Sequence, residues 1–285
     1  MLPYLHNKGG IIKIKLIFIY FLAVIKIMYI KSSDSPIQSY YRYKIWIEYD
    51  GSFFHGWQRQ KGLSTVQASI EDVLELVMGQ KTLVEGAGRT DTGVHATGQI
   101  GHFDLNKHYP AFRLKDALNA HLRDKGIVIL KIEECDVNFH ARFSATSRTY
   151  HYHIINRRTP LALDRFRAWH VIPKLDIEVM QKAASHLVGS HDFSSFRSAD
   201  CQSNSALKTL TQFGIKQEEE RIIATIKARS FLHNQVRIMM GTLKKIGEGK
   251  WTPVDLLRIL EAKDRTLAGP TAPPHGLYLV DVGYE

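Results

Sequence analysis

The chain has 285 residues, enough for one large domain or two small ones with a sizeable core, and its 38 lysines and arginines against 28 acidic residues give a net charge of +10. Its only cysteines are Cys135 and Cys201, so a disulfide framework is excluded and a reducing compartment fits. The basic charge suits a polyanionic partner, but it does not by itself separate a nucleic-acid-binding protein from an ordinary basic cytosolic protein.

Residues 1–40 differ from the rest of the chain. Residues 11–30 are mostly apolar, but three lysines interrupt them, and the uninterrupted part, 16–25, is too short to span a bilayer. No small-x-small cleavage site follows, and the arginines and serines of a transit peptide are missing. We therefore expect a dispensable N-terminal extension or an over-extended start, with a membrane tether as the less favoured alternative and no obligatory membrane partner.

The first half, residues 41–145, predicts six elements in the order βαββαβ. Apolar and aromatic residues alternate at its start as in a strand, and a helical pattern follows with Ser64 as N-cap, Gln67 at N3 and Gly79 as its stop. The order is that of a split-βαβ unit. The expected elements are a strand at 43–49, a helix at 64–78, a strand at 82–85, a strand ending at Phe103, a helix at 114–122 and a strand at 127–132.

The second half, residues 146–285, repeats this plan. It contains an apolar helical stripe from Leu232 to Ile246 and a helix capped by Thr252 with Pro253 at N1. We predict an α+β fold of two duplicated split-βαβ halves, RRM/ferredoxin-like, whose antiparallel sheets join around a central cleft. The other expected elements are a strand at 148–155, a helix at 176–188 stopped by Gly189, strands at 207–215 and 221–229, and a last strand at 277–284.

The stretch GAGRTDTGVHATGQ, residues 86–99, places one carboxylate, Asp91, among four glycines, with Arg89 two residues earlier. A dinucleotide fingerprint is excluded because Asp91 occupies its third glycine position, and a P-loop is excluded because Val94 and His95 follow the last glycine. Glycine allows a ligand to approach the backbone closely. We interpret the loop as presenting an acid to a polar ligand; the alternative is a hairpin whose aspartate caps a turn.

A metal site is not expected. His151 and His153 alternate with tyrosines on a predicted strand and so share one face, but no third ligand lies near them in the sequence. A surface face is the better interpretation of this pair.

Several separated motifs carry a family resemblance that runs from about Tyr41 to Glu285. R-T-D-x-G-V-H-x-x-G-Q resembles the active-site motif of the tRNA pseudouridine synthase A family. The further matching segments are IEYDGSFFHGWQRQ, FHARFSATSRTYHY, HDFSSFR, FLHNQVRIMMG and AKDRTLAGPTAPPHGLYL.

The resemblance implies a cytoplasmic, homodimeric isomerase that converts uridine to pseudouridine at positions 38 to 40 of the tRNA anticodon arm. It implies no cofactor, and it gives Asp91 the role of nucleophile and Tyr150 that of the active-site tyrosine. A target base has to leave its stack and needs an aromatic floor, which Tyr150 would supply. Arg89 could keep Asp91 ionised, occupy the space of the flipped base, or hold a phosphate.

Contacts to the RNA backbone should come from basic residues around the cleft, although a solvated basic face is the alternative for each of them. A non-catalytic RNA-binding protein on an RRM-like duplicated sheet is the competing function, but the aromatic pattern of RRM sheets is missing. The candidate arginines are Arg42, Arg59, Arg142, Arg148, Arg197 and Arg237, and we take Arg142 and Arg237, with Arg89 and Tyr150, as the substrate-binding set.

Overall fold

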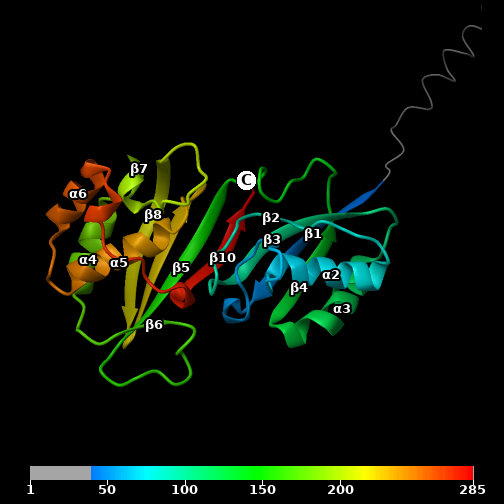
Figure 1. The fold of residues 1–285 in the computed structure, drawn as a ribbon, viewed down its shortest axis with the longest axis horizontal. Helices are drawn as coiled ribbons and strands as arrows, with labels where there is room; N and C mark the ends of the chain where they lie inside the picture. The colour runs from blue at the N-terminus through cyan, green and yellow to red at the C-terminus, as the bar shows by residue number, and fades with distance from the viewer. Residues whose placement is uncertain (1–39, 285) are drawn as a thin grey trace, which may run out of the picture. The chain divides into compact units, whose positions relative to one another are not determined.

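The computed structural model describes residues 40–284, and from Tyr41 onward these form one compact unit (Figure 1). The expectation for residues 1–39 lies outside the described part of the chain. Within that part, no helix is both long and apolar enough to cross a membrane. The helices are α2 (Val66–Met78), α3 (Ala111–Leu122), α4 (Ile177–Ser185), α5 (Gln235–Gly247) and α6 (Pro253–Ala262).

The strands form a single ten-stranded sheet, which confirms the predicted α+β class. Its order is β4-β1-β3-β10-β5-β9-β8-β7, with β2 paired to β3 and β6 paired to β5. The strands are β1 (Tyr41–Tyr49), β2 (Glu85–Gly86), β3 (His95–Leu105), β4 (Ile127–Glu134), β5 (Ser147–Asn156), β6 (Trp169–Val171), β7 (Gly189–Asp192), β8 (Leu207–Glu218), β9 (Arg221–Ala228) and β10 (Leu277–Gly283).

The last strand joins the strands of the first half to those of the second. β10 pairs in parallel with β3, with Leu279 opposite Ala96, and antiparallel with β5, with Leu279 opposite Tyr150. Gly98 permits this junction, because a Cβ added there would lie 2.1 Å from the carbonyl oxygen of Val280. The sheet is therefore continuous only because β10, at the end of the chain, lies between β3 and β5.

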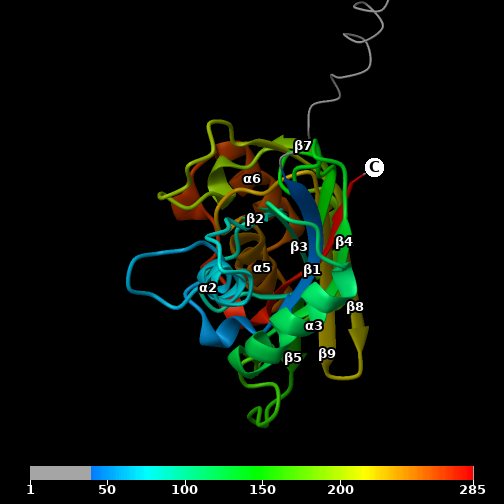
Figure 2. The ribbon, with the colours of Figure 1, turned by 90° about the vertical axis from the view of Figure 1, so that its right-hand side faces the viewer.

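Side chains that are buried at every second position of the strands mark the face of the sheet on which the helices pack. Along β9 every second side chain is buried, and β5 alternates in the same way over most of its length. α3 packs on β4, and α4 packs on both β8 and α5. α2, α5 and α6 lie on the same side of the strands (Figure 2).

Two predicted details of the first half are wrong. α2 starts at Val66, and its N-cap is Thr65, whose side chain accepts the N–H of Ala68. The expected cap at Ser64 does not form: the N–H of Gln67, which it would cap, donates to the carbonyl of Trp57, and the side chain of Gln67 donates to Glu71 and to the carbonyl of Val84. The strand expected at 82–85 is reduced to the two residues of β2.

In the second half, the capped helix is confirmed and two short strands were missed. Thr252 and Asp255 form a complete capping box at the start of α6, with Pro253 at its first position. α4 ends at Ser185, three residues earlier than expected, and Gly189 begins β7 instead of stopping the helix. Strands as short as β6 and β7 leave no periodicity to detect.

Substitution of Gly98 by alanine should loosen the junction between β3 and β10. A methyl group placed 2.1 Å from a backbone oxygen forces the strands apart, and we expect the free energy of unfolding to fall by roughly 1–3 kcal/mol. Gly214→Ala in β8 is the matched control, because nothing lies within 4 Å of a Cβ there. Urea titrations of both variants make the comparison, and equal stability would contradict the close approach.

Candidate active site

The loop that carries Asp91, residues 86–94, is fastened at several points; we call it the aspartate loop. Gln99 donates a hydrogen bond of 2.7 Å to the carbonyl of Gly88. The N–H of Trp57 donates to the carbonyl of Thr90 at 3.0 Å, and the Thr90 hydroxyl lies 2.8 Å from that of Tyr49. The loop is thus held from β3, from β1 and from the segment after β1.

Two glycines allow the aspartate loop to fit its surroundings. Gly56 has a φ of +90°, and a Cβ added to it would lie 2.6 Å from the carbonyl oxygen of Thr90. Gly93 has a φ of +78°, a conformation that residues with a side chain rarely adopt, and it lies against Pro274. A side chain at either position would displace the residues that flank Asp91.

Asp91 lies between two basic side chains of the second half. Its Oδ2 is 3.2 Å from Nη1 of Arg237, and its Oδ1 is 3.3 Å from Nε2 of His233. The side chain of Asp91 is 27% exposed and that of Arg237 is 15% exposed. The carboxylate is therefore oriented by the protein and still open to solvent, as an acid that meets a substrate has to be.

Arg237 is held in place independently of Asp91. It stands in the first turn of α5, donates from Nε to the carbonyl of Ala272 at 2.8 Å, and donates from Nη1 to Oδ1 of Asn234 at 2.6 Å. Because two acceptors other than Asp91 already engage the guanidinium, its position is fixed before any ligand arrives.

His233 is not among the substrate-binding residues predicted from the sequence. In the structure it precedes α5, which begins at Gln235. Its N–H donates to Sγ of Cys201 at 3.3 Å, and its carbonyl accepts the N–H of Ser198 at 3.2 Å. Only the fold brings it to Asp91, so no periodic signal in the sequence could have revealed the contact.

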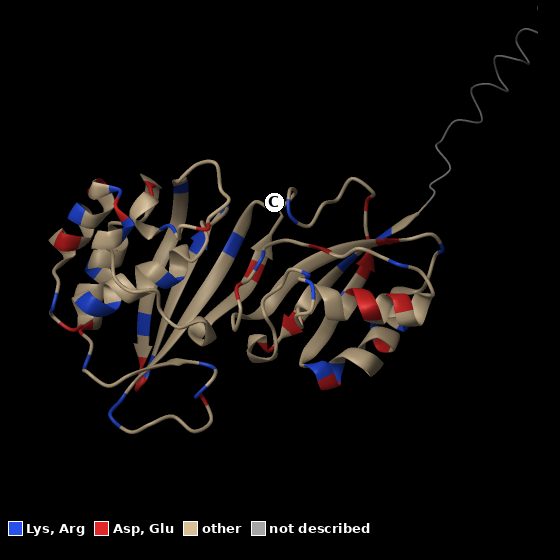
Figure 3. Ribbon diagram, in the orientation of Figure 1, with Lys and Arg blue, Asp and Glu red and all other residues tan. Residues whose placement is uncertain are grey.

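The structure places the sequence-predicted arginines in different settings. Arg237 contacts Asp91, whereas Arg89 is exposed and reaches Gln202, with 3.4 Å between Nη1 and Oε1. Arg142 is exposed and lies over the ring of Phe143. Lysines and arginines are spread over both ends of the sheet and are not confined to one strand or helix (Figure 3).

Arg148 is a buried structural residue. Each of its five N–H groups donates to a backbone carbonyl, so its guanidinium has no donor left for a ligand. One of these carbonyls belongs to Ala87 of the aspartate loop, and the others belong to Arg142, Ala145 and Arg229. Arg148 thus ties the aspartate loop to the segments that flank β5 and β9.

The other candidate arginines are also engaged within the protein. Arg42 pairs with Asp104, Arg59 pairs with Glu71 and Asp72, and Arg197 donates to two carbonyls of its own loop.

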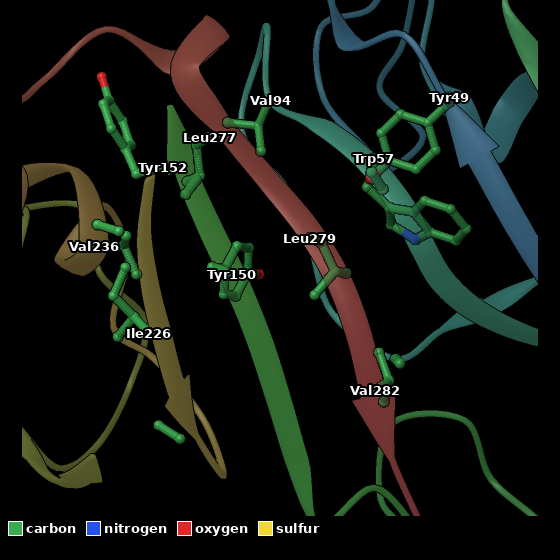
Figure 4. Packing of buried hydrophobic residues seen from close by; sticks show 14 of the residues in the cluster. Tyr49, Trp57, Val94, Tyr150, Tyr152, Ile226, Val236, Leu277, Leu279 and Val282 are labelled. Atoms are coloured by element: carbon green, nitrogen blue, oxygen red, sulfur yellow. The ribbon is translucent and has the colours of Figure 1, made fainter. Parts of the chain in front are cut away.

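Tyr150 extends from β5 toward the aspartate loop. Only 9% of the residue is exposed, its ring meets that of Phe231 edge to face at 5.2 Å, and a Cβ added to Gly88 would lie 3.9 Å from its hydroxyl oxygen. Burial, and to a smaller extent Asp91, raises the pKa of Tyr150, so its hydroxyl stays protonated at neutral pH. In Figure 4 it stands beside Leu279 of β10. Tyr152, two residues on, is fully buried in the core.

His95 follows the aspartate loop as the first residue of β3. Its Nδ1 accepts the N–H of Gly51 at 3.0 Å, its Nε2 donates to the carbonyl of Phe166 at 2.9 Å, and its ring stacks on that of Tyr278 at 4.6 Å. These contacts define a neutral imidazole with its proton on Nε2. Burial lowers the pKa of His95, outweighing the opposite effect of Asp50.

Among residues 40–284, no group of three or more histidine, cysteine, aspartate or glutamate side chains is placed to hold a metal ion. The chemistry that the described residues offer is that of a single oriented carboxylate beside an arginine, a histidine and a buried tyrosine.

The fold and site define an α+β protein with a carboxylate at the junction of two parts of one sheet. The family model described as tRNA pseudouridine synthase matches residues 45–144 and 183–285. Proteins named tRNA pseudouridine synthase A are similar to this chain: that of Paramagnetospirillum magneticum is 52% identical over 86% of this chain and 95% of its own length. Those of Xanthobacter autotrophicus and Anaplasma phagocytophilum are 51% identical over 85% of this chain and 99% and 100% of their lengths. The chain belongs to the tRNA pseudouridine synthase family, whose members are isomerases.

Two desolvated histidines, the buried His102 and the half-buried His153, predict how stability depends on pH. Burial lowers the pKa of His102 and of His153 to about 4, from an ordinary value of 6.5. Between these values the unfolded chain binds more protons than the folded one, so the free energy of unfolding should rise from pH 4 to pH 6.5 and fall on acidification. Urea titrations across this range test the slope, and His102→Asn, which can still accept the N–H of Ala141, should reduce it. A flat profile would contradict the buried neutral state.

Proposed function

We propose that the protein converts uridine to pseudouridine in the anticodon stem-loop of tRNA, at positions 38 to 40, with Asp91 as the nucleophile. The observation that carries this proposal is the oriented carboxylate of Asp91, which lies between Arg237 and His233 and remains partly exposed. The family of the chain and the names of its relatives support tRNA as the substrate.

The reaction needs no net change of atoms or electrons. The bond between N1 of uracil and C1′ of ribose breaks, the base turns, and C5 bonds to C1′. The proton on C5 leaves to the solvent or a base, and N1 takes up one proton, so the product is an isomer of the substrate. A carboxylate can form the transient covalent bond that holds one fragment during the turn, either on the ribose or on the uracil. Arg237 and His233 orient Asp91 for that attack and offset charge that develops beside it.

Tyr150 is proposed to support the flipped base. Its raised pKa makes the protonated hydroxyl the prevailing form, which suits a hydrogen-bond donor or an apolar support better than a base. Arg89 and Arg142 are exposed and are proposed to contact the RNA backbone. Arg237, which sequence reasoning also assigned to substrate binding, is proposed to act through Asp91.

The organisation of the chain extends the proposal. We infer that residues 41–145 and 146–285 are two duplicated split-βαβ subdomains, and that the working form is a cytoplasmic homodimer that needs no cofactor. The placement of the aspartate loop in one half and of Arg237 in the other supports a site built by both halves. The non-catalytic RNA-binding alternative gives no reason for such an oriented acid.

Asp91→Asn should abolish pseudouridine formation while leaving the fold and most of the RNA affinity intact. The amide has nearly the same shape but cannot act as a carboxylate nucleophile, and phosphate contacts dominate affinity. Tritium release from C5-labelled uridine in tRNA measures the reaction. Asp116→Asn, an exposed aspartate on α3, is the matched control and should keep full activity. Release by Asp91→Asn at the parent rate would remove Asp91 from the mechanism and favour the RNA-binding alternative.

Tyr150→Phe should keep more turnover than Tyr150→Ala. Phenylalanine preserves the packing on Phe231 and the apolar support for the base, whereas alanine opens a cavity that costs about 3–5 kcal/mol of stability in addition. We expect Tyr150→Phe to lose less than tenfold in kcat. Single-turnover assays on folded protein, with thermal unfolding as the check on structure, distinguish the two. Equal and complete loss in both variants would give the hydroxyl an essential role.

A further inference from the structure

The loop between β5 and β6, residues 157–168, is a strongly basic and partly apolar surface; we call it the arginine loop. It has four arginines against one aspartate, Asp164, and it exposes Leu163 by 93% and Phe166 by 55%. The blue segments along it in Figure 3 are arginines, because the loop contains no lysine. The loop lies outside both stretches that the family model matches, so its role has to be read from its structure.

The backbone of the arginine loop is fixed at both ends. At its start, Arg157 donates to the carbonyls of Thr159 and Pro160 and pairs with Glu220 at 3.0 Å. In its middle, Asp164 accepts from Arg221 at 3.0 Å. The loop therefore presents its remaining side chains from a defined position, which lowers the entropy cost of binding a ligand.

The end of the arginine loop is attached to His95, the residue that follows the aspartate loop. The carbonyl of Phe166 accepts the Nε2 proton of His95 at 2.9 Å, and the carbonyl of Arg167 accepts the hydroxyl of Tyr278, the ring on which His95 stacks. The guanidinium of Arg167 also lies 3.5 Å from Asp50. His95 is 3% exposed and only four residues after Asp91, so it couples the loop to the end of the aspartate loop.

Two arginines remain for a partner. Within residues 40–284, Arg158 and Arg165 form no ion pair, and Arg165 lies over the exposed ring of Phe166 with 4.9 Å between the guanidinium carbon and the ring centre. Cations placed next to an exposed aromatic ring are what single-stranded nucleic acid recognises, because phosphates pair with the cations and bases stack on the ring. An acidic protein could pair with the two arginines, but it has no base to stack on the ring of Phe166.

We propose that the arginine loop is an RNA-binding surface for the tRNA nucleotides that flank the target uridine. Arg158 and Arg165 bind phosphates, Phe166 stacks on an unpaired base, and His95 holds the loop against the aspartate loop. This inference rests on the proposed function and deepens it, because it assigns contacts outside the site around Asp91.

Binding of labelled, unmodified tRNA transcript tests the surface. The measurements use the full chain carrying Asp91→Asn, so that the RNA is not converted. Arg158→Gln combined with Arg165→Gln should weaken binding about tenfold at low salt and reduce the slope of log Kd against log salt by about 1.5, since each lost phosphate contact removes roughly 0.7–0.9. Arg113→Gln with Arg123→Gln, two exposed arginines at α3, is the control and should change Kd less than twofold.

Phe166→Ala separates stacking from charge. It should weaken binding severalfold without changing the salt slope, because it removes no cation. If the double arginine variant has the same Kd and the same slope of log Kd against log salt as the parent, the proposal is overturned. A change of sedimentation behaviour with unchanged RNA affinity would also overturn it, by showing that the loop contacts a second copy of the chain.

A double-mutant cycle tests the coupling through His95. His95→Phe keeps a ring on Tyr278 but loses both hydrogen bonds, so the arginine substitutions should cost about twofold in that background instead of tenfold. In His95→Gln, whose amide can still donate toward Phe166, the arginine substitutions should again cost more than twofold in RNA affinity. This variant replaces His95→Phe in the cycle if His95→Phe does not fold. Additive losses would contradict the coupling.

These outcomes are separable from failure of the proposed function. If the parent chain releases tritium from tRNA and Asp91→Asn does not, the function stands whatever the loop variants do. If the parent neither binds nor converts tRNA, the function itself fails.

Discussion

The contact between Asp91 and Arg237 is the constraint on which the site depends, because it joins residues 146 positions apart in the chain. Neither side chain could hold this geometry alone. An ion pair between two partly exposed groups is worth little when its members are free to move, since side-chain entropy offsets the Coulomb attraction. Here the guanidinium is already fixed by Ala272 and Asn234, so little entropy is lost when the carboxylate meets it.

The rest of the fold keeps these two side chains at that distance. β10 brings the second half against β3 at the point where the aspartate loop ends, and Gly98 allows the strands to meet. Arg148 adds a connection that no strand provides, because it donates to the carbonyl of Ala87 on the aspartate loop and to that of Arg229, beyond the end of β9. A buried guanidinium with all donors satisfied avoids the cost of an unpaired buried charge and rigidifies what it touches.

Much of this architecture could be predicted from the sequence, because strands such as β9 and helices such as α6 carry their own period and caps. The N-cap of α2 could not, since Ser64 and Thr65 are both capping residue types and the N–H of Gln67 is taken by the carbonyl of Trp57, a contact that only the fold creates. Asp91 was identifiable by its loop.

The environment of Asp91 was not identifiable in the same way. Arginines look alike in a sequence, and only the fold separates Arg148, used entirely within the protein, from Arg237, placed at the acid. The contact of His233 likewise depends on a loop with no periodic pattern.

The burial of Tyr150 limits how a base can use it. With 9% of the residue exposed and its ring edge against Phe231, a uracil cannot lie over the whole face of the ring in the arrangement described. The part of Tyr150 nearest the aspartate loop is its hydroxyl, beside Gly88. Since Asp91 is more open than Tyr150, an incoming nucleotide meets the carboxylate first. In the proposed reaction the tyrosine then bounds the inner end of the space that the base enters, which makes the size of its side chain the property that the reaction senses.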